Sequence, residues 1–461
     1  MLSHLSTSSR FVSDESANLK RSLKNRHIQL IAMGGAIGTG LFLGSAHIIQ
    51  SAGPSIILGY AIGGLIAFLI MRQLGEMIVE EPVAGSFSHL AYKYWGRFAG
   101  FLTGWNYWVV YLLVAMTELT AVAQYINYWW PHIPAWASVL FFFILITGIN
   151  LLNVKIYGES EFWLALIKVA SVLAMIVFGL YLLFFAPPSS SSSFTNLWTH
   201  GGFFPHGFDG LFYMLAFILF AFGGIELIGM TAAEADQPKK SIPKAINQVV
   251  FRVLVFYIGS LSILLSLVPW DELRLGGLEQ SPFVLIFKQL GFSWAANLLN
   301  FIILTAALSV YNSGMYANSR MLFGLAKQKN APQIFLKTNK QGVPYYCVLF
   351  SAVLIFACVL LNYFVPEKAL SHLMYISVAG LVLNWAMITC THLKFKKAKQ
   401  QKGEKTAFPA LFSPASNYVV LAFIMLVLYI MCNQGFAESV IILPLWVFVL
   451  FILYKFKLDE K

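Results

Sequence analysis

The chain alternates long apolar segments with short connections that are rich in charged and polar residues. A transmembrane helix needs about 20 predominantly apolar residues. Twelve segments meet this requirement, at 28–50, 55–77, 98–128, 136–154, 161–186, 209–234, 247–270, 292–325, 343–364, 370–393, 417–434 and 437–456. The pattern therefore predicts an all-α integral membrane protein with 12 transmembrane helices.

The first apolar segment contains a run, Gly34 to Gly40, in which four of seven residues are glycine. Each glycine costs about 1 kcal/mol relative to alanine inside a helix, so we expect the helix to be broken here. Non-helical backbone at membrane depth survives only beside protein or a water-filled cavity. The run therefore predicts a cavity. Close helix packing through Gly34/Gly38 and Gly40/Gly44 is the alternative, and the two are compatible.

The sixth apolar segment contains a second interruption, Phe220 to Glu226, in which a glycine pair precedes an acid. Because the two interrupted segments lie five spans apart, two five-helix units that begin there would cross the membrane in opposite senses. Broken helices at matching positions of inverted repeats indicate a binding site at the midplane. Their half-helix ends offer N–H groups to a carboxylate and carbonyls to an ammonium, which suits a zwitterion.

Basic residues fall on alternate connections between the apolar segments. With Lys168 set aside, 27 of the lysines and arginines lie on one side and three on the other, which places both termini in the cytoplasm. This topology explains the net charge of +11, so nucleic-acid binding is not needed to account for it. The content of charged residues, 11%, also excludes an ordinary soluble domain, in which about 25% are charged.

Together these features divide the chain into seven parts. They are a cytoplasmic tail (1–27), a first five-helix repeat (28–186), an external linker with a flexible Ser-rich stretch (187–208), a second five-helix repeat (209–395), a basic cytoplasmic loop (396–416), helices eleven and twelve (417–457) and a cytoplasmic C-terminus (458–461).

Neither an enzyme nor a metal site is indicated. The four cysteines lie in or beside apolar segments without Cys-x-x-Cys spacing, and no histidine pair, serine elbow or phosphate loop has the spacing that catalysis requires. A channel would give no role to two broken helices. We therefore predict no catalytic residue, no metal and no cofactor.

Three ionisable residues within the spans are candidates for function, because a charge at the helix centre costs about 3 kcal/mol. They are Glu118, Lys168 and Glu226. Each also has a structural interpretation. Glu226 can bond freed backbone N–H groups, Glu118 can join two helices, and Lys168 can extend its ammonium to the membrane surface.

Two further groups are candidates for the cavity wall. Tyr107, Tyr111 and Ala115 recur every four residues, with Glu118 on about the same face, and such an aromatic wall suits a flat apolar side chain. In the eighth segment, the polar cluster at residues 309–313 either lines the cavity or holds helices together, and the pattern favours neither.

Several motifs also resemble the amino-acid transporter family of the amino acid-polyamine-organocation (APC) superfamily. They are Lys24 to Phe42, Ser51 to Pro54, Met71 to Met77, Phe222 to Glu226, Ala232 to Ala235, Ser241 to Ala245 and Asn318 to Gly324. Within that family, Glu80 to Phe87 and Ala91 to Gly96 look most like bacterial aromatic-amino-acid and phenylalanine permeases. The resemblance implies a LeuT-like fold of two inverted five-helix repeats plus two helices, in the inner membrane.

The resemblance also implies proton-coupled uptake, with Lys168 where sodium-coupled relatives hold a cation. We therefore predict import of phenylalanine, tyrosine and tryptophan by a monomer in the lipid bilayer, through proton symport with alternating access. A permease for other neutral amino acids and an exchanger remain alternatives. Lys168, Glu118 and Glu226 are the proton-coupling candidates. The predicted substrate-binding residues are Ala36, Ile37, Gly38, Thr39, Gly40, Tyr107, Tyr111, Ala115, Phe220, Ala221, Phe222, Gly223, Glu226, Ser309 and Asn312.

Overall fold

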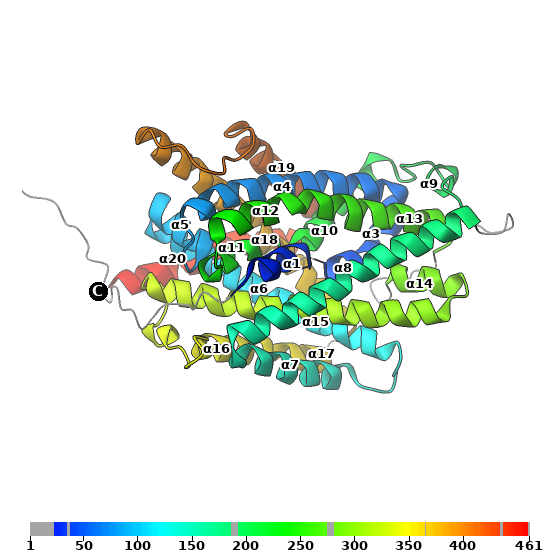
Figure 1. Ribbon diagram of the computed structural model, residues 1–461, viewed down its shortest axis with the longest axis horizontal. Coiled ribbons are helices and arrows are strands. Elements are labelled where there is room, and N and C mark those ends of the chain that lie inside the picture. The colour runs from blue at the N-terminus through cyan, green and yellow to red at the C-terminus, as the bar shows by residue number, and fades with distance from the viewer. Residues whose placement is uncertain are drawn as a thin grey trace, which may run out of the picture.

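The computed structural model describes residues 23–34, 37–185, 192–273, 281–364, 366–433 and 437–459. Its long helices run roughly side by side along the long axis of the molecule (Figure 1). The first half of the chain forms α1 (Asn25–Gly34), α2 (Thr39–Phe42), α3 (Gly44–Ala52), α4 (Ile56–Glu80), α5 (Ser86–Tyr94), α6 (Arg97–Asn127), α7 (Ala135–Leu152) and α8 (Val154–Phe185).

The second half of the chain is also helical. It forms α9 (Asn196–Thr199), α10 (Gly207–Phe222), α11 (Leu227–Thr231), α12 (Pro238–Arg252), α13 (Ser260–Leu267), α14 (Pro282–Gln289), α15 (Ser293–Lys327), α16 (Tyr345–Ile355), α17 (Ala357–Phe364), α18 (Pro366–Gln401), α19 (Ala415–Asn433) and α20 (Ala437–Asp459). Helices α5 and α11 lie at one end of the bundle, and α9 and α14 at the other (Figure 1).

Eleven helical segments of the described chain are long and apolar enough to cross a membrane, one fewer than the sequence pattern predicts. The difference arises at the first two predicted spans. Helix α1 has only 10 residues, and the residues from Thr39 to Glu80 form one continuous segment of 42 residues. A short 3-10 turn, Gly53–Ser55, joins α3 to α4 within it.

Both glycine-rich runs interrupt a helix. Helix α1 ends at Gly34 and α2 begins at Thr39, while α10 ends at Phe222 and α11 begins at Leu227. In the second break Gly224 has a φ of +103°, a backbone conformation that glycine adopts without strain. Gly35 and Ala36 lie outside the described residues.

The two interrupted helices meet in the centre of the bundle, beside α6 and α15. Helix α6 packs along α15 and α18, and α1 packs between α8 and α12. The labels of α1, α6, α10 and α18 accordingly lie in the middle of Figure 1. Apolar side chains on the outside of the bundle, such as Phe141 on α7, Phe184 on α8 and Phe448 on α20, are more than half exposed, which suits contact with lipid.

At the end of the bundle that carries α11, the start of the described chain is hydrogen-bonded to the segment after α11. The Leu23 N–H donates to the Glu234 carbonyl at 3.1 Å, and the Asp236 N–H donates to the Leu23 carbonyl at 3.2 Å. The Glu234 carboxylate also accepts a hydrogen bond from Nε of Arg320 at 2.9 Å, and both side chains are buried. These contacts tie the start of the described chain and α15 to the segment after α11.

The loop between α18 and α19 lies against α4 at the same end. Glu76 of α4 is fully buried and accepts hydrogen bonds from Nε2 of His392 at 2.8 Å, Nζ of Lys396 at 2.9 Å, the Ala410 N–H at 2.8 Å and the Thr406 hydroxyl. One carboxylate of α4 therefore holds both α18 and the loop that follows it.

The predicted Ser-rich flexible stretch, 187–193, lies mostly outside the described residues. Its last two residues are bonded to the chain near the end of α13. The Ser193 N–H donates to the Ser266 carbonyl at 2.8 Å, and Oγ of Ser192 donates to the Leu267 carbonyl at 3.0 Å.

Candidate substrate cavity

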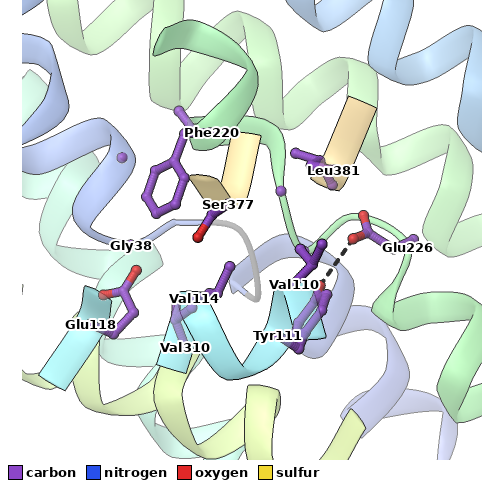
Figure 2. Close-up of a pocket in the computed structure, with 14 residues that line it drawn as sticks. Gly38, Val110, Tyr111, Val114, Glu118, Phe220, Glu226, Val310, Ser377 and Leu381 are labelled. Carbon is purple, nitrogen blue, oxygen red and sulfur yellow. Dashed lines mark hydrogen bonds between the residues drawn. The ribbon is translucent and has the colours of Figure 1, made fainter. Parts of the chain in front are cut away.

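A narrow cavity lies between the two helix breaks, α6, α15 and α18 (Figure 2). Its volume, measured as the space open to the centre of a water molecule, is about 20 Å³, which is room for a single ordered water. The lining residues are Gly38, Gly40, Val110, Tyr111, Val114, Glu118, Phe220, Ala221, Gly223, Gly224, Glu226, Val310, Ser377 and Leu381.

Close approach of the two broken segments forms one wall of this cavity. A Cβ atom added at Gly40 would lie 2.6 Å from Cα of Ala221, closer than two carbon atoms can pack. The Ala221 carbonyl in turn accepts a hydrogen bond from the Tyr257 hydroxyl at 2.8 Å. The glycine at position 40 is thus required by backbone contact between α2 and the end of α10.

At the start of α2, a side chain occupies the backbone donors that the sequence assigns to a substrate carboxylate. The Thr39 N–H lies 3.3 Å from Oε1 of Glu118, and the Thr39 hydroxyl donates to Oε2 of the same residue. Glu118 is 2% exposed. A carboxylate at this position is stabilised by the positive N-terminal end of the second half-helix, so Glu118 and a bound anion would compete for the same donors.

At the other break, Glu226 immediately precedes α11 and is fully buried. Its Oε1 accepts a hydrogen bond from the Tyr111 hydroxyl at 3.1 Å. Figure 2 shows this bond beside Val110, with Glu118 at a distance along the same helix, α6. The cavity therefore has one carboxylate near each helix break and largely apolar side chains between them.

Two cations lie at the C-terminal end of α1. Nζ of Lys168 donates to the Gly34 carbonyl at 2.7 Å and to the Ile37 carbonyl at 3.3 Å. Nη1 of Arg252 donates to the Ala32 carbonyl at 2.7 Å. Lys168 has no exposed surface, so its ammonium does not extend to the membrane surface. Both cations stabilise the negative end of the short helix.

Several predicted site residues lie outside the cavity wall. Tyr107 packs against Tyr111 in a tilted arrangement with ring centroids 4.4 Å apart, and Phe222 packs against Tyr257 at 4.9 Å. Ala115 is buried in α6 but does not line the cavity. The Ile37 carbonyl binds Lys168 and Thr39 binds Glu118, but neither residue lines the cavity. Ala36 lies outside the described residues.

The polar cluster on α15 also faces away from the cavity. The Ser309 hydroxyl donates to Oε1 of Glu161, and Nδ2 of Asn312 lies 3.5 Å from Oε2 of the same carboxylate. Oδ1 of Asn312 accepts a hydrogen bond from Nδ2 of Asn150 at 2.8 Å. Of the two interpretations of this cluster, contact between helices fits the geometry, because α15 joins α7 and α8 here.

Several other residues that line the cavity are not predicted from the sequence. Val110 and Val114 flank Tyr111 on α6, and Val310 follows Ser309 on α15. Each lies one residue from a predicted site residue, so a small difference in the assumed rotation of the helix separates them from the prediction. Ser377 and Leu381 of α18 lie one turn apart in an apolar span that carries no other signal. Arg252 and Glu161 are not among the site residues that the sequence predicts.

The site has the chemistry of a binding cavity. Among the residues that the structure describes, no group of three or more histidine, cysteine, aspartate or glutamate side chains could hold a metal ion. Apolar walls with a few convergent polar groups at the ends are typical of small-molecule sites.

Comparison with known proteins points in the same direction. The sequence profile of the family described as "Amino acid permease" matches residues 27–461. The aromatic amino acid transport protein AroP of Escherichia coli (strain K12) is 61% identical over 440 residues, which cover 95% of this chain and 96% of the relative. AroP of Salmonella typhimurium (strain LT2) is 62% identical over 440 residues, with the same shares of the two chains. An uncharacterized amino acid permease of Bacillus subtilis (strain 168), YtnA, is 44% identical over 440 residues, which cover 95% of this chain and 94% of the relative.

Proposed function

The chain belongs to the amino acid permease family, and from this premise we propose that it imports phenylalanine, tyrosine and tryptophan by proton symport. The cavity between the two helix breaks is the observation that carries this proposal, because it combines a carboxylate near each break with an apolar centre. Relatives with more than 60% identity that are named for aromatic amino acid transport support the choice of substrate.

In this proposal the substrate ring occupies the apolar part of the cavity, against Phe220, Val114 and Leu381. Aromatic rings bury a large area and pair favourably with other rings. The substrate carboxylate accepts a hydrogen bond from the Thr39 N–H and displaces Glu118. The substrate ammonium binds at the second helix break, beside Glu226. The cavity has room for about one water, so substrate entry requires its walls to move apart.

Three buried groups are the proposed proton-coupling residues: Lys168, Glu118 and Glu226. As an ammonium, Lys168 holds the end of α1 through two carbonyl groups; as a neutral amine it loses the charge that makes these bonds strong. A proton at Lys168 thereby favours one arrangement of α1 over another, which is the minimum requirement for coupling. Protonation of Glu118 would help the substrate carboxylate to replace it.

We extend the proposal to the arrangement of the chain in the bacterial inner membrane. Its twelve helices form two inverted five-helix repeats plus α19 and α20, both termini face the cytoplasm, and the transporter acts as a monomer. The asymmetry of 27 basic residues against three supports this orientation. The repeat, linker and loop boundaries are those stated from the sequence.

The test is uptake into proteoliposomes of labelled phenylalanine, tyrosine, tryptophan, histidine and a short aliphatic amino acid, with and without a proton gradient. We expect saturable accumulation of the three aromatic substrates that a protonophore abolishes. Preference for the aliphatic amino acid would overturn the substrate assignment, and a requirement for sodium would overturn proton coupling.

Lys168→Met separates binding from coupling, because methionine retains the apolar length of lysine but does not bind a proton. We expect exchange of internal for external phenylalanine to persist while accumulation driven by the gradient is lost. Full proton-driven accumulation by this variant would exclude Lys168 and leave Glu118 and Glu226 as candidates.

A further inference from the structure

Glu161 of α8 is a carboxylate in the interior of the bundle that the proposed transport mechanism does not use. It has no exposed surface. The Ser309 hydroxyl and Nδ2 of Asn312, both on α15, bind its two oxygens, and Asn150 of α7 supports Asn312. A lone carboxylate at membrane depth is costly, and helix contact alone could be made by neutral side chains.

Glu161 shares a helix face with the proposed coupling residue. Ala165 and Lys168 follow it by four and seven residues, positions that lie on one side of an α-helix. Seven residues correspond to a rise of about 10.5 Å. The side chain between them, Ala165, is small and fully buried. At Gly34 the end of α1 lies against this same alanine, because an added Cβ there would meet Cβ of Ala165 at 2.5 Å.

The Lys168 ammonium consequently has two buried acids in its electrostatic surroundings. Its charge interacts with the carboxylates of Glu161 and Glu118, and with the guanidinium of Arg252 on α12. Around Glu161 itself, the titratable groups on α8 are Lys168 and Tyr157, while α15 presents neutral Ser309, Asn312 and Ser313. Glu118 already binds Thr39, whereas Glu161 has Lys168 as the cation facing it.

We propose that Glu161 is a positioning residue for transport, a fixed counter-charge that acts on Lys168 and sets the pH at which Lys168 binds and releases its proton. The proposal rests on the coupling role of Lys168 in the proposed function. In the ionised state Glu161 stabilises the ammonium, and thereby the two bonds from the ammonium to the end of α1. Ser309 and Asn312 hold the carboxylate in this state by donating to it.

The sign of the effect follows from Coulomb's law. A negative charge near Lys168 favours the protonated amine, so its removal requires a higher proton concentration for the same occupancy. With an effective dielectric constant of about 20 and a separation of about 10 Å, the change corresponds to roughly one pH unit.

The experiment measures the initial rate of phenylalanine uptake into proteoliposomes across a range of pH at a fixed membrane potential. Glu161→Gln should lower the pH of half-maximal uptake by about one unit. Glu161→Asp retains the charge and should keep the midpoint close to that of the unmodified protein. Glu438→Gln is the control, because it removes an exposed carboxylate from the first turn of α20 and should leave the midpoint unchanged.

Ser309→Ala provides a second route if Glu161→Gln fails to fold. Loss of one donor makes the ionised carboxylate less favourable, so the midpoint should move in the same direction by a smaller amount. In a Lys168→Met background, Glu161→Gln should leave the pH dependence of phenylalanine exchange unchanged, because the inferred effect acts through Lys168.

Two results would overturn the inference. One is an unchanged pH of half-maximal uptake in a folded Glu161→Gln protein, in an experiment where the Lys168→Met protein does lose accumulation. The other is an equal shift with Lys168 absent. Full accumulation by Lys168→Met would instead remove the coupling role on which the inference rests, so failure of the inference and failure of the proposed function give different outcomes.

Discussion

The Tyr111 hydroxyl, at the cavity wall, uses its single proton to bond Glu226, so it can take part in a further hydrogen bond only as an acceptor. Such an oxygen can accept a hydrogen bond from the indole N–H of tryptophan. Phenylalanine has no corresponding donor. Among the proposed substrates, discrimination at this position would thus come from one hydrogen bond.

We therefore expect Tyr111→Phe to weaken competition by tryptophan about fivefold, the value of a net hydrogen bond of about 1 kcal/mol. Competition by phenylalanine should change less, because its ring contacts remain. Inhibition of labelled tyrosine uptake by each competitor measures the difference. Equal losses for both would show that Tyr111 acts through Glu226 and not on the substrate.

Gly40 gives a second prediction at this scale. In Gly40→Ala the new methyl group would meet Cα of Ala221 at 2.6 Å, whereas in Gly44→Ala the nearest atom outside the helix is the flexible Cε of Met374 at 3.5 Å. We expect Gly40→Ala to lose most phenylalanine uptake and Gly44→Ala to retain it, at equal protein abundance in the membrane. Similar losses in both variants would favour general helix packing as the role of these glycines.

Individual residues also show where prediction from sequence succeeds and stops. Glycine content predicts both helix breaks, and a charge within an apolar span makes Lys168, Glu118 and Glu226 candidates. Both signals are visible in the sequence because the energetic cost of such a residue is local. The face that a side chain occupies depends on helix rotation. Val310 lines the cavity and its neighbour Ser309 does not, although the serine is the more polar residue.

At the scale of elements, the same limit affects the helices around the cavity. The seventh predicted span, 247–270, begins inside α12, a helix that contains Pro243 four residues earlier, and it includes a π-helical stretch, Val253–Gly259, before α13. An apolar pattern specifies length and not the local winding of a helix. Likewise, hydropathy does not reveal that α1 stops after 10 residues and that two cations cap its carbonyls.

Helix α4 and the loop between α18 and α19 provide a prediction for stability. Glu76→Gln should leave His392, Lys396 and the Ala410 amide with a neutral partner, and we expect a loss of about 3 kcal/mol because a buried ionic network is broken. The thermal unfolding midpoint in detergent measures the effect. Glu404→Gln, which removes a surface acid paired with Lys399, is the control and should not shift the midpoint.

For the whole molecule, backbone hydrogen bonds join the start of the described chain to the segment after α11, and the central cavity has room for about one water. Alternating access then requires the start of α1 to separate from the segment after α11. The buried pair of Glu234 and Arg320 opposes this separation. Opening of this end therefore requires a defined set of contacts to break, once for each substrate transported.

The main-chain hydrogen bonds between Leu23 and the segment 234–236 allow the frequency of this separation to be measured. While they are intact, the amide hydrogens of Leu23 and Asp236 are shielded from solvent deuterium; each opening exposes them. Arg320→Met, which removes the partner of Glu234, should speed deuterium uptake at these two amides by roughly tenfold or more, while amides in the middle of α6 stay slow. Unchanged deuterium uptake at these amides would show that opening occurs between other parts of the chain. If uptake does accelerate, two backbone hydrogens that lie outside the cavity wall record how often the transporter opens.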